Sequence, residues 1–211
     1  MQRSILSQWK IRMPGELEFW FEYGSTYTYL SVARIGHLAK AANVSLRWKP
    51  FLLAPLFSKI GLTQGPFLPF PSKMRYMWQD LQRRAALHGL PYRKPSVYPP
   101  NTLLTARVGV VAAEEGWCAE FTSGVFDRHW TQDVVIGTPQ NLRESIRAAG
   151  RDPDGVIAKA ESFENKAALR VQTQTAEDKG IFGSPSFFVH GELFWGDDRL
   201  EDAIRHTQVA N

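Results

Sequence analysis

Residues 17–30 read LEFWFEYGSTYTYL, and this stretch predicts a buried strand that runs into a helix. The run up to Tyr23 is dense in aromatic and apolar side chains, as expected of a strand inside a protein core. Gly24, Ser25 and Thr26 then break the run and supply hydroxyls that can cap a following helix. We therefore expect Ser25 at a helix N-terminus, where unpaired N–H groups and the helix dipole stabilise an anion such as a carboxylate, a phosphate or a thiolate.

Two interpretations of Ser25 stay open from this stretch alone. Serine and threonine are ordinary N-cap residues, so the hydroxyl of Ser25 can serve only its own helix. Alternatively, the hydroxyl serves a ligand bound at the helix N-terminus.

The composition indicates a globular protein that binds neither metal nor membrane. The chain has 211 residues, 44% of them hydrophobic, which suffices for one large domain or one domain with an insert. No run approaches the roughly 18 apolar residues of a membrane span, and residues 1–11 lack a signal-peptide stretch, so we expect a cytoplasmic protein. A single cysteine, Cys118, excludes an internal disulfide and a Cys-x-x-Cys redox pair. The five histidines are scattered, and no metal site is predicted.

The charge pattern argues against nucleic acid as a partner. The formal net charge is +4, from 25 Lys and Arg against 21 Asp and Glu, and the basic residues are dispersed. Arg83-Arg84 and Arg93-Lys94 are local basic pairs of the kind usually found on solvated faces. A mild positive bias suits small anionic ligands.

Downstream of the opening stretch, the pattern predicts a parallel strand pair and then a helical block. A helix over Tyr27–Ala42 leads to an alternating strand over Val44–Lys49, an arrangement that implies a right-handed crossover. The segment Pro50–Pro71 holds too many prolines and glycines for regular elements. Helices are then expected over Ser72–His88, Asn101–Glu115, Cys118–Trp130 and Glu164–Asp178. The start signals Thr138-Pro139 and Asp152-Pro153 predict two more helices, the first of which reaches Ala149.

The chain returns to strands near its end. Ser186–His190 and Leu193–Trp195 are predicted strands joined by a tight hairpin turn, and Arg199–Thr207 is the last helix. The order β-α-β, helical block, β-β-α predicts a four-stranded mixed sheet with helices on its faces.

Two further sites near these strands could carry chemistry. Pro185 opens a strand, which structure alone explains, but a cis Ser184-Pro185 bond would turn the backbone of Ser184 toward a ligand. Asp197 and Asp198 stand at a helix start, where they are either acidic caps or acceptors for the ammonium of an amino-acid-like ligand.

Three motifs in this order and spacing resemble one family. They are residues 23–30 with the helix-start serine, the turn 183–185, and residues 195–200, which read WGDDRL; residues 75–81, RYMWQDL, open the helical block. This pattern resembles the 2-hydroxychromene-2-carboxylate isomerases and their relatives, the kappa-class glutathione transferases, and more distantly the DsbA-type thiol oxidoreductases.

The resemblance implies an α/β, thioredoxin-like fold (β-α-β … β-β-α) with a large all-helical insertion. Residues 1–16 would be an N-terminal extension, residues 17–50 and 180–211 the thioredoxin-like domain, and residues 51–179 the helical insertion domain. Relatives also suggest a homodimer.

The resemblance further implies glutathione as the cofactor. Ser25 matches the catalytic serine that hydrogen-bonds the glutathione sulfur, and Ser184, before Pro185, matches the position whose backbone pairs with the cysteinyl part. Asp197 and Asp198 match the positions that hold the γ-glutamyl end.

This sequence departs from the family pattern at three places. Thr26 replaces a proline that commonly follows the serine, and Glu22 replaces the preceding aspartate. A family asparagine after the second strand has no clear match, since only Thr63 or Gln64 is available.

The implied activity is the interconversion of 2-hydroxychromene-2-carboxylate and trans-o-hydroxybenzylidenepyruvate in aromatic degradation, on a small aromatic carboxylate substrate. The alternatives are a kappa-class-like transferase that conjugates an electrophile and a non-catalytic thioredoxin-like binding module. Conventional thiol-disulfide exchange is excluded, because Ser25 cannot form a mixed disulfide.

A substrate pocket beneath the 50–71 segment is also expected. Its candidate wall residues, each equally explicable as plain core, are Tyr27, Phe51, Phe57, Tyr76 and Trp78. Arg75 is a candidate partner for the substrate carboxylate.

Overall fold

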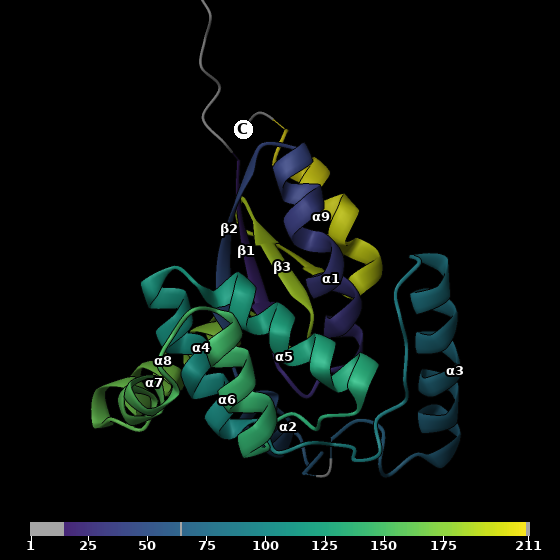
Figure 1. Ribbon diagram of the computed structural model, residues 1–211. Helices are drawn as coiled ribbons and strands as arrows, with labels where there is room; N and C mark the ends of the chain where they lie inside the picture. The colour runs from purple at the N-terminus through teal and green to yellow at the C-terminus, as the bar shows by residue number, and fades with distance from the viewer. Residues whose placement is uncertain (1–14, 64, 210–211) are drawn as a thin grey trace, which may run out of the picture.

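A computed structural model describes residues 15–63 and 65–209 and contains the predicted four-stranded mixed sheet (Figure 1). The strands are β1 (Gly15–Phe21), β2 (Val44–Pro50), β3 (Ser186–Val189) and β4 (Glu192–Trp195). Their order in the sheet is β2-β1-β3-β4, with β2 parallel to β1 and β3 antiparallel to both β1 and β4. The predicted thioredoxin-like fold is therefore confirmed, including the parallel first pair.

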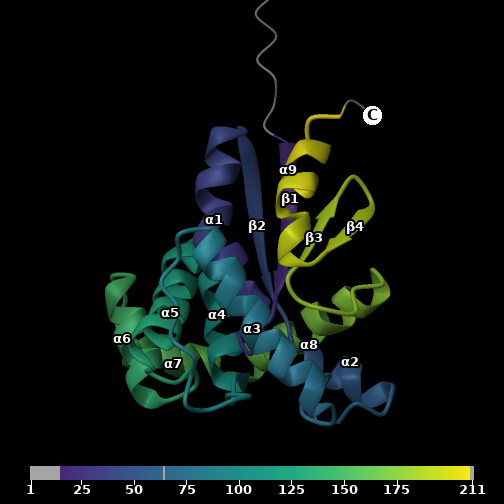
Figure 2. The same ribbon diagram turned by 90° about the vertical axis from the view of Figure 1, so that its right-hand side faces the viewer.

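Helices connect and cover this sheet. They are α1 (Thr26–Ala41), α2 (Leu53–Lys59), α3 (Pro71–Leu87), α4 (Leu103–Glu115), α5 (Cys118–Gln132), α6 (Pro139–Ala148), α7 (Pro153–Ala160), α8 (Phe163–Asp178) and α9 (Leu200–His206), with a 3₁₀ turn η1 (Asp197–Arg199) before α9. The helices α2 to α8 lie between β2 and β3 in the chain, as the predicted insertion requires. In Figures 1 and 2, α1 and α9 cover the same face of the sheet, and the helices from α4 to α8 gather at the end where β1 finishes.

The alternation of β1 places its side chains in two different cores. Leu17, Phe19 and Phe21 are fully buried in the larger core, which includes side chains of α1 and α9. Phe19 stacks on Phe187 of β3, with ring centroids 5.5 Å apart. Trp20 points to the opposite face, into a smaller core with residues of α2 and α8. Burying each such side chain contributes about 1.5–3 kcal/mol, so β1 anchors the fold from both faces.

Helix α2 corrects the expectation that the segment after β2 has no regular element. It spans Leu53–Lys59 and buries Leu53 and Leu56. Pro55 lies in its first turn, where backbone N–H groups have no intrahelical partner, so the proline removes no hydrogen bond there. Reading each proline as a helix breaker therefore overlooked this element.

Two of the sequence expectations concern residues that the structure does not describe. Residues 1–14 of the expected N-terminal extension lie outside them, whereas Gly15 and Glu16 already pair with Val44 and Ser45 in the sheet. Gln64 also lies outside the described residues. Within the described part of the chain, none of the helices combines the length and apolar character needed to cross a lipid bilayer.

Candidate active site

The hydroxyl of Ser25 does not cap its own helix. Ser25 occupies the N-cap position of α1, with φ −78° and ψ 124°, yet its side chain makes no capping bond. Instead the Ser25 hydroxyl donates to the backbone carbonyl of Ser184, 2.7 Å away. The capping interpretation is therefore wrong for the side chain, and the hydroxyl lies across from the turn that precedes β3.

Ser184 connects this turn to the end of β1 and the start of α1. The Ser184-Pro185 bond is cis, which confirms that prediction. The Ser184 hydroxyl accepts the Glu22 N–H at 2.8 Å and lies 2.8 Å from the Thr28 hydroxyl. The Gly196 N–H donates to the carbonyl of Pro185 at 2.9 Å, which places η1 directly beside the turn. The first and second predicted sites are thus one cluster.

Glu22 is a buried residue directly after β1, three residues before Ser25. Its side chain accepts the Gly24 N–H at 2.8 Å and the Thr102 hydroxyl at 2.6 Å. Burial raises the pKa of Glu22 to about 7, and the hydrogen bonds only partly oppose this shift. The group thus changes charge near neutral pH, next to a helix N-terminus. Sequence reasoning noted Glu22 only as a replacement for an aspartate, although an acid at the end of an aromatic strand was a usable signal.

Asp197 faces two guanidinium groups. Its side chain is fully buried, and Oδ2 accepts Arg84 Nε at 2.7 Å and Arg84 Nη2 at 2.5 Å. Arg34 Nη2 lies 3.8 Å from the same oxygen and donates to the Asp197 carbonyl at 3.1 Å. Burial raises the pKa of Asp197 above its ordinary value, and the bonds from Arg84 oppose that shift.

Asp198 occupies a different environment from its neighbour. Its side chain is 49% exposed and lies 3.0 Å from the Arg199 guanidinium. The expected acidic capping is wrong for both residues, because neither η1 nor α9 has a side-chain cap and the N-cap of η1 is Gly196. Both carboxylates form ion pairs with arginine instead. Of the two residues, Asp198 exposes its carboxylate to solvent and Asp197 does not.

The candidate aromatic residues do not form one wall. Phe51 and Phe57 belong to the smaller core around Trp20, whereas Tyr27 and Trp78 pack against the larger core. Tyr76 is 59% exposed.

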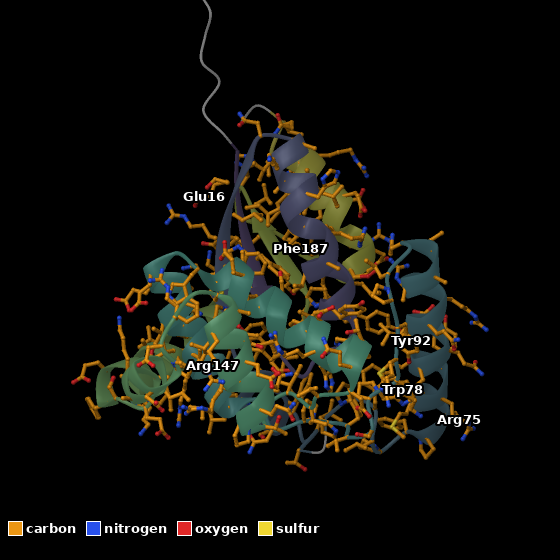
Figure 3. All side chains as sticks on the ribbon, viewed as in Figure 1. Glu16, Arg75, Trp78, Tyr92, Arg147 and Phe187 are labelled. Carbon is orange, nitrogen blue, oxygen red and sulfur yellow. The ribbon has the colours of Figure 1, made fainter. Side chains whose placement is uncertain are left out.

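The remaining polar candidates point away from the cluster or lie apart from it. In Figure 3, Arg75 extends from the side of α3 that faces away from the rest of the chain, and Trp78 lies on the opposite side. The Arg75 guanidinium donates to the Ser72 hydroxyl at 3.1 Å. Thr63 is exposed in the segment between α2 and α3. Among the described residues, no hydrogen bond or ion pair joins Arg75 or Thr63 to Ser25.

Cys118 cannot replace the missing redox cysteine. It is 3% exposed, and burial raises its pKa to about 12, so the reactive thiolate does not form at neutral pH. Among the described residues, no group of three or more His, Cys, Asp or Glu side chains is placed to bind a metal ion.

A thioredoxin-like sheet with a hydroxyl at the N-terminus of α1, opposite a cis-proline turn, defines a thioredoxin-type site without the redox cysteine. The chain belongs to the DsbA-like thioredoxin domain family, whose model matches residues 16–207. More particularly, it is 30% identical over 190 residues to 2-hydroxychromene-2-carboxylate isomerase of Pseudomonas putida, covering 87% of this chain and 90% of that protein.

Two further relatives agree with this branch of the family. Glutathione S-transferase kappa 2 of Caenorhabditis elegans is 28% identical over 200 residues, covering 87% of this chain and 88% of that protein. A solved selenomethionine 2-hydroxychromene-2-carboxylate isomerase superposes with a TM-score of 0.82 at 25% identity, over 92% of this chain and 94% of that one. These matches confirm the resemblance found in the sequence motifs.

Proposed function

We propose that this protein is a glutathione-dependent isomerase that interconverts 2-hydroxychromene-2-carboxylate and trans-o-hydroxybenzylidenepyruvate. The observation that carries the proposal is the Ser25 hydroxyl, which lies at the N-terminus of α1 but serves the opposite turn rather than its own helix. The isomerases named among the relatives support the substrate class, a small aromatic carboxylate.

The cluster offers groups that fit the peptide and thiol parts of glutathione. Among the described residues, the Ser25 side chain makes no capping bond to the first turn of α1, and a helix N-terminus of this kind stabilises an anionic sulfur. Among the described residues, the Ser184 N–H donates to no acceptor, and Ser184 as a whole is partly exposed. A peptide backbone can pair with that N–H by strand addition, as the cysteinyl part of glutathione requires.

The residues of the chain would stabilise charge rather than form covalent bonds. When bound at Ser25 and the N-terminus of α1, glutathione would supply a nucleophilic thiolate for reversible addition to the conjugated double bond of the substrate. Ser25 would turn its hydroxyl from the Ser184 carbonyl to the sulfur, and the α1 N–H groups would stabilise the negative charge. A free thiol titrates near pH 8.5, so this stabilisation raises the reactive fraction at neutral pH.

A transferase is the second candidate, because a kappa-class relative matches nearly the whole chain. A transferase would use the same thiolate but release the conjugate with the sulfur still bonded to the electrophile. Mass analysis of the product separates the two, since an isomerase returns free glutathione after each turnover.

Isomerisation of 2-hydroxychromene-2-carboxylate, measured with and without glutathione, tests the proposal. We expect turnover that requires glutathione and falls at least tenfold in Ser25→Ala. Ser31→Ala is the matched control, because Ser31 is on the same helix and its buried hydroxyl has no partner among the described residues. Equal turnover in the wild type and both variants would contradict the role of Ser25, and turnover without glutathione would contradict the cofactor.

A further inference from the structure

Arg84 presents a guanidinium group of which only one edge is used. Its bonds run from Nε and Nη2 to Asp197, and among the described residues Nη1 donates to no acceptor. The Arg84 side chain is 25% exposed, whereas that of Asp197 is fully buried. A planar guanidinium held along one edge can bind a carboxylate along the other.

Asp197 is therefore poorly placed to contact a ligand directly. Arg84 and Arg34 both lie against its carboxylate, and Arg34 is bonded in turn to Glu201. An incoming ammonium would have to displace a guanidinium from a buried carboxylate, at a large desolvation cost. The position of Asp197 instead fixes the orientation of Arg84.

Two contacts connect the elements around Arg84 to neighbours of Ser25. Tyr27, two residues after Ser25, donates its hydroxyl to Asp80 Oδ2 at 2.8 Å. Asp80 is one helical turn before Arg84 on α3, so the two side chains share one face of that helix. On the other side, η1 starts beside Pro185, as the bond from the Gly196 N–H shows. A ligand that extends from Ser25 past the turn toward η1 would approach Arg84.

The charges at this end match an amino-acid zwitterion. Asp198 exposes a carboxylate, and Arg84 exposes part of a guanidinium. Asp198 directly follows Asp197, the residue that holds the Arg84 guanidinium. An α-amino carboxylate needs one group of each sign.

We propose that Arg84, held in place by Asp197, binds the α-carboxylate of the γ-glutamyl end of glutathione, an end for which the family resemblance implies only Asp197 and Asp198. This inference rests on the proposed function, because it takes glutathione as the ligand. It makes Arg84 a specificity-determining residue contributed by the helical insertion.

A change in the ligand tests the contact without any change in the protein. The probes are glutathione and the analogue γ-aminobutyryl-cysteinyl-glycine, which lacks only the γ-glutamyl α-carboxylate. Calorimetry with the wild-type chain should show at least tenfold weaker binding of the analogue. Equal affinity for the two thiols would overturn the inference while leaving the proposed function intact, and failure of glutathione itself to bind would overturn both.

Variants then locate the preference on Arg84. Arg84→Met combined with Asp197→Asn removes the buried pair together and should bind both thiols within twofold of each other. If the double variant does not fold, Arg84→Lys replaces it, because lysine keeps a positive charge beside Asp197. This variant should reduce the preference for glutathione over the analogue. Arg83→Met, at an exposed neighbour on α3, is the control and should keep it. Retention of the full preference in folded Arg84 variants would overturn the inference.

Discussion

The two ends of the candidate site satisfy their polar groups in different ways. At the Ser25 end, the Ser184 and Thr28 hydroxyls bond to each other, and the Ser25 and Ser184 hydroxyls bond to backbone groups. At the Asp197 end, a buried carboxylate is held by two guanidinium groups, one of them from the helical insertion. A neutral hydroxyl can exchange one hydrogen-bond partner for another at little cost in free energy. Separating a buried ion pair costs much more.

This difference teaches which residues can turn toward a ligand. The Ser25 hydroxyl can leave the Ser184 carbonyl for a better acceptor, because a neutral hydrogen bond is worth only about 0.5–1.5 kcal/mol. Asp197 cannot leave Arg84 so cheaply, since its charge would stay buried and unpaired. The first end is therefore suited to chemistry, and the second to holding a fixed group in place.

The largest expected effect comes from breaking the ion pair. Asp197→Ala should lower the free energy of unfolding by about 3–5 kcal/mol, because it leaves Arg84 and Arg34 without their shared partner. Asp198→Ala is the matched control, because Asp198 is the exposed neighbour of Asp197. It should change the free energy of unfolding by no more than about 0.5 kcal/mol. Urea denaturation of both variants measures the difference. Equal losses would show that the two ends do not differ as described.

A smaller, pH-dependent effect is expected at the Ser25 end. The pKa of Glu22 is raised from 4.5 to about 7 in the folded protein, so its contribution to stability is fully present below pH 4.5 and is lost as the pH rises to about 7. Glutamine does not titrate. Between these pH values, the unfolding free energy of Glu22→Gln should therefore rise relative to the wild type by about 3 kcal/mol.

Urea titrations of both proteins from pH 4 to about pH 8 give this difference directly, since the other groups cancel. A difference that stays constant with pH would mean that Glu22 ionises as an ordinary carboxyl. A drift in the opposite direction would mean that the Gly24 and Thr102 bonds outweigh burial.

Local patterns in the sequence predicted the elements well where the signals were short-range. The start signals at Thr138-Pro139 and Asp152-Pro153 do cap α6 and α7, with side-chain bonds to Asn141 and Gly155. The predicted alternation of the second strand also matches β2, in which Val44, Leu46 and Trp48 are less exposed than Ser45 and Arg47. The failure at α2 has a local cause too, because Pro55 sits in the first helical turn, where proline is tolerated.

The environment of the site residues depended on long-range packing and was not predictable in the same way. The sequence placed Asp197 at a helix start, but its partner Arg84 lies 113 residues away, on a helix of the insertion. Arg84 looked like part of an ordinary basic pair. Likewise, the buried Glu22 carboxyl accepts a hydrogen bond from Thr102, 80 residues downstream. The motifs thus locate these residues in the sequence. Whether each side chain is already bonded within the protein depends on contacts with residues outside the motifs.

The ionisation of bound glutathione, followed by thiolate absorbance in the ultraviolet against pH, tests the role of Ser25 most directly. With the wild-type chain and the Ser31→Ala control, we expect the bound thiol to titrate below its value in free solution, because the α1 N-terminus and the Ser25 hydroxyl stabilise the thiolate. Ser25→Ala should shift that titration to higher pH. Coincident titrations of the wild type and Ser25→Ala, with full turnover in the variant, would contradict the assignment of Ser25.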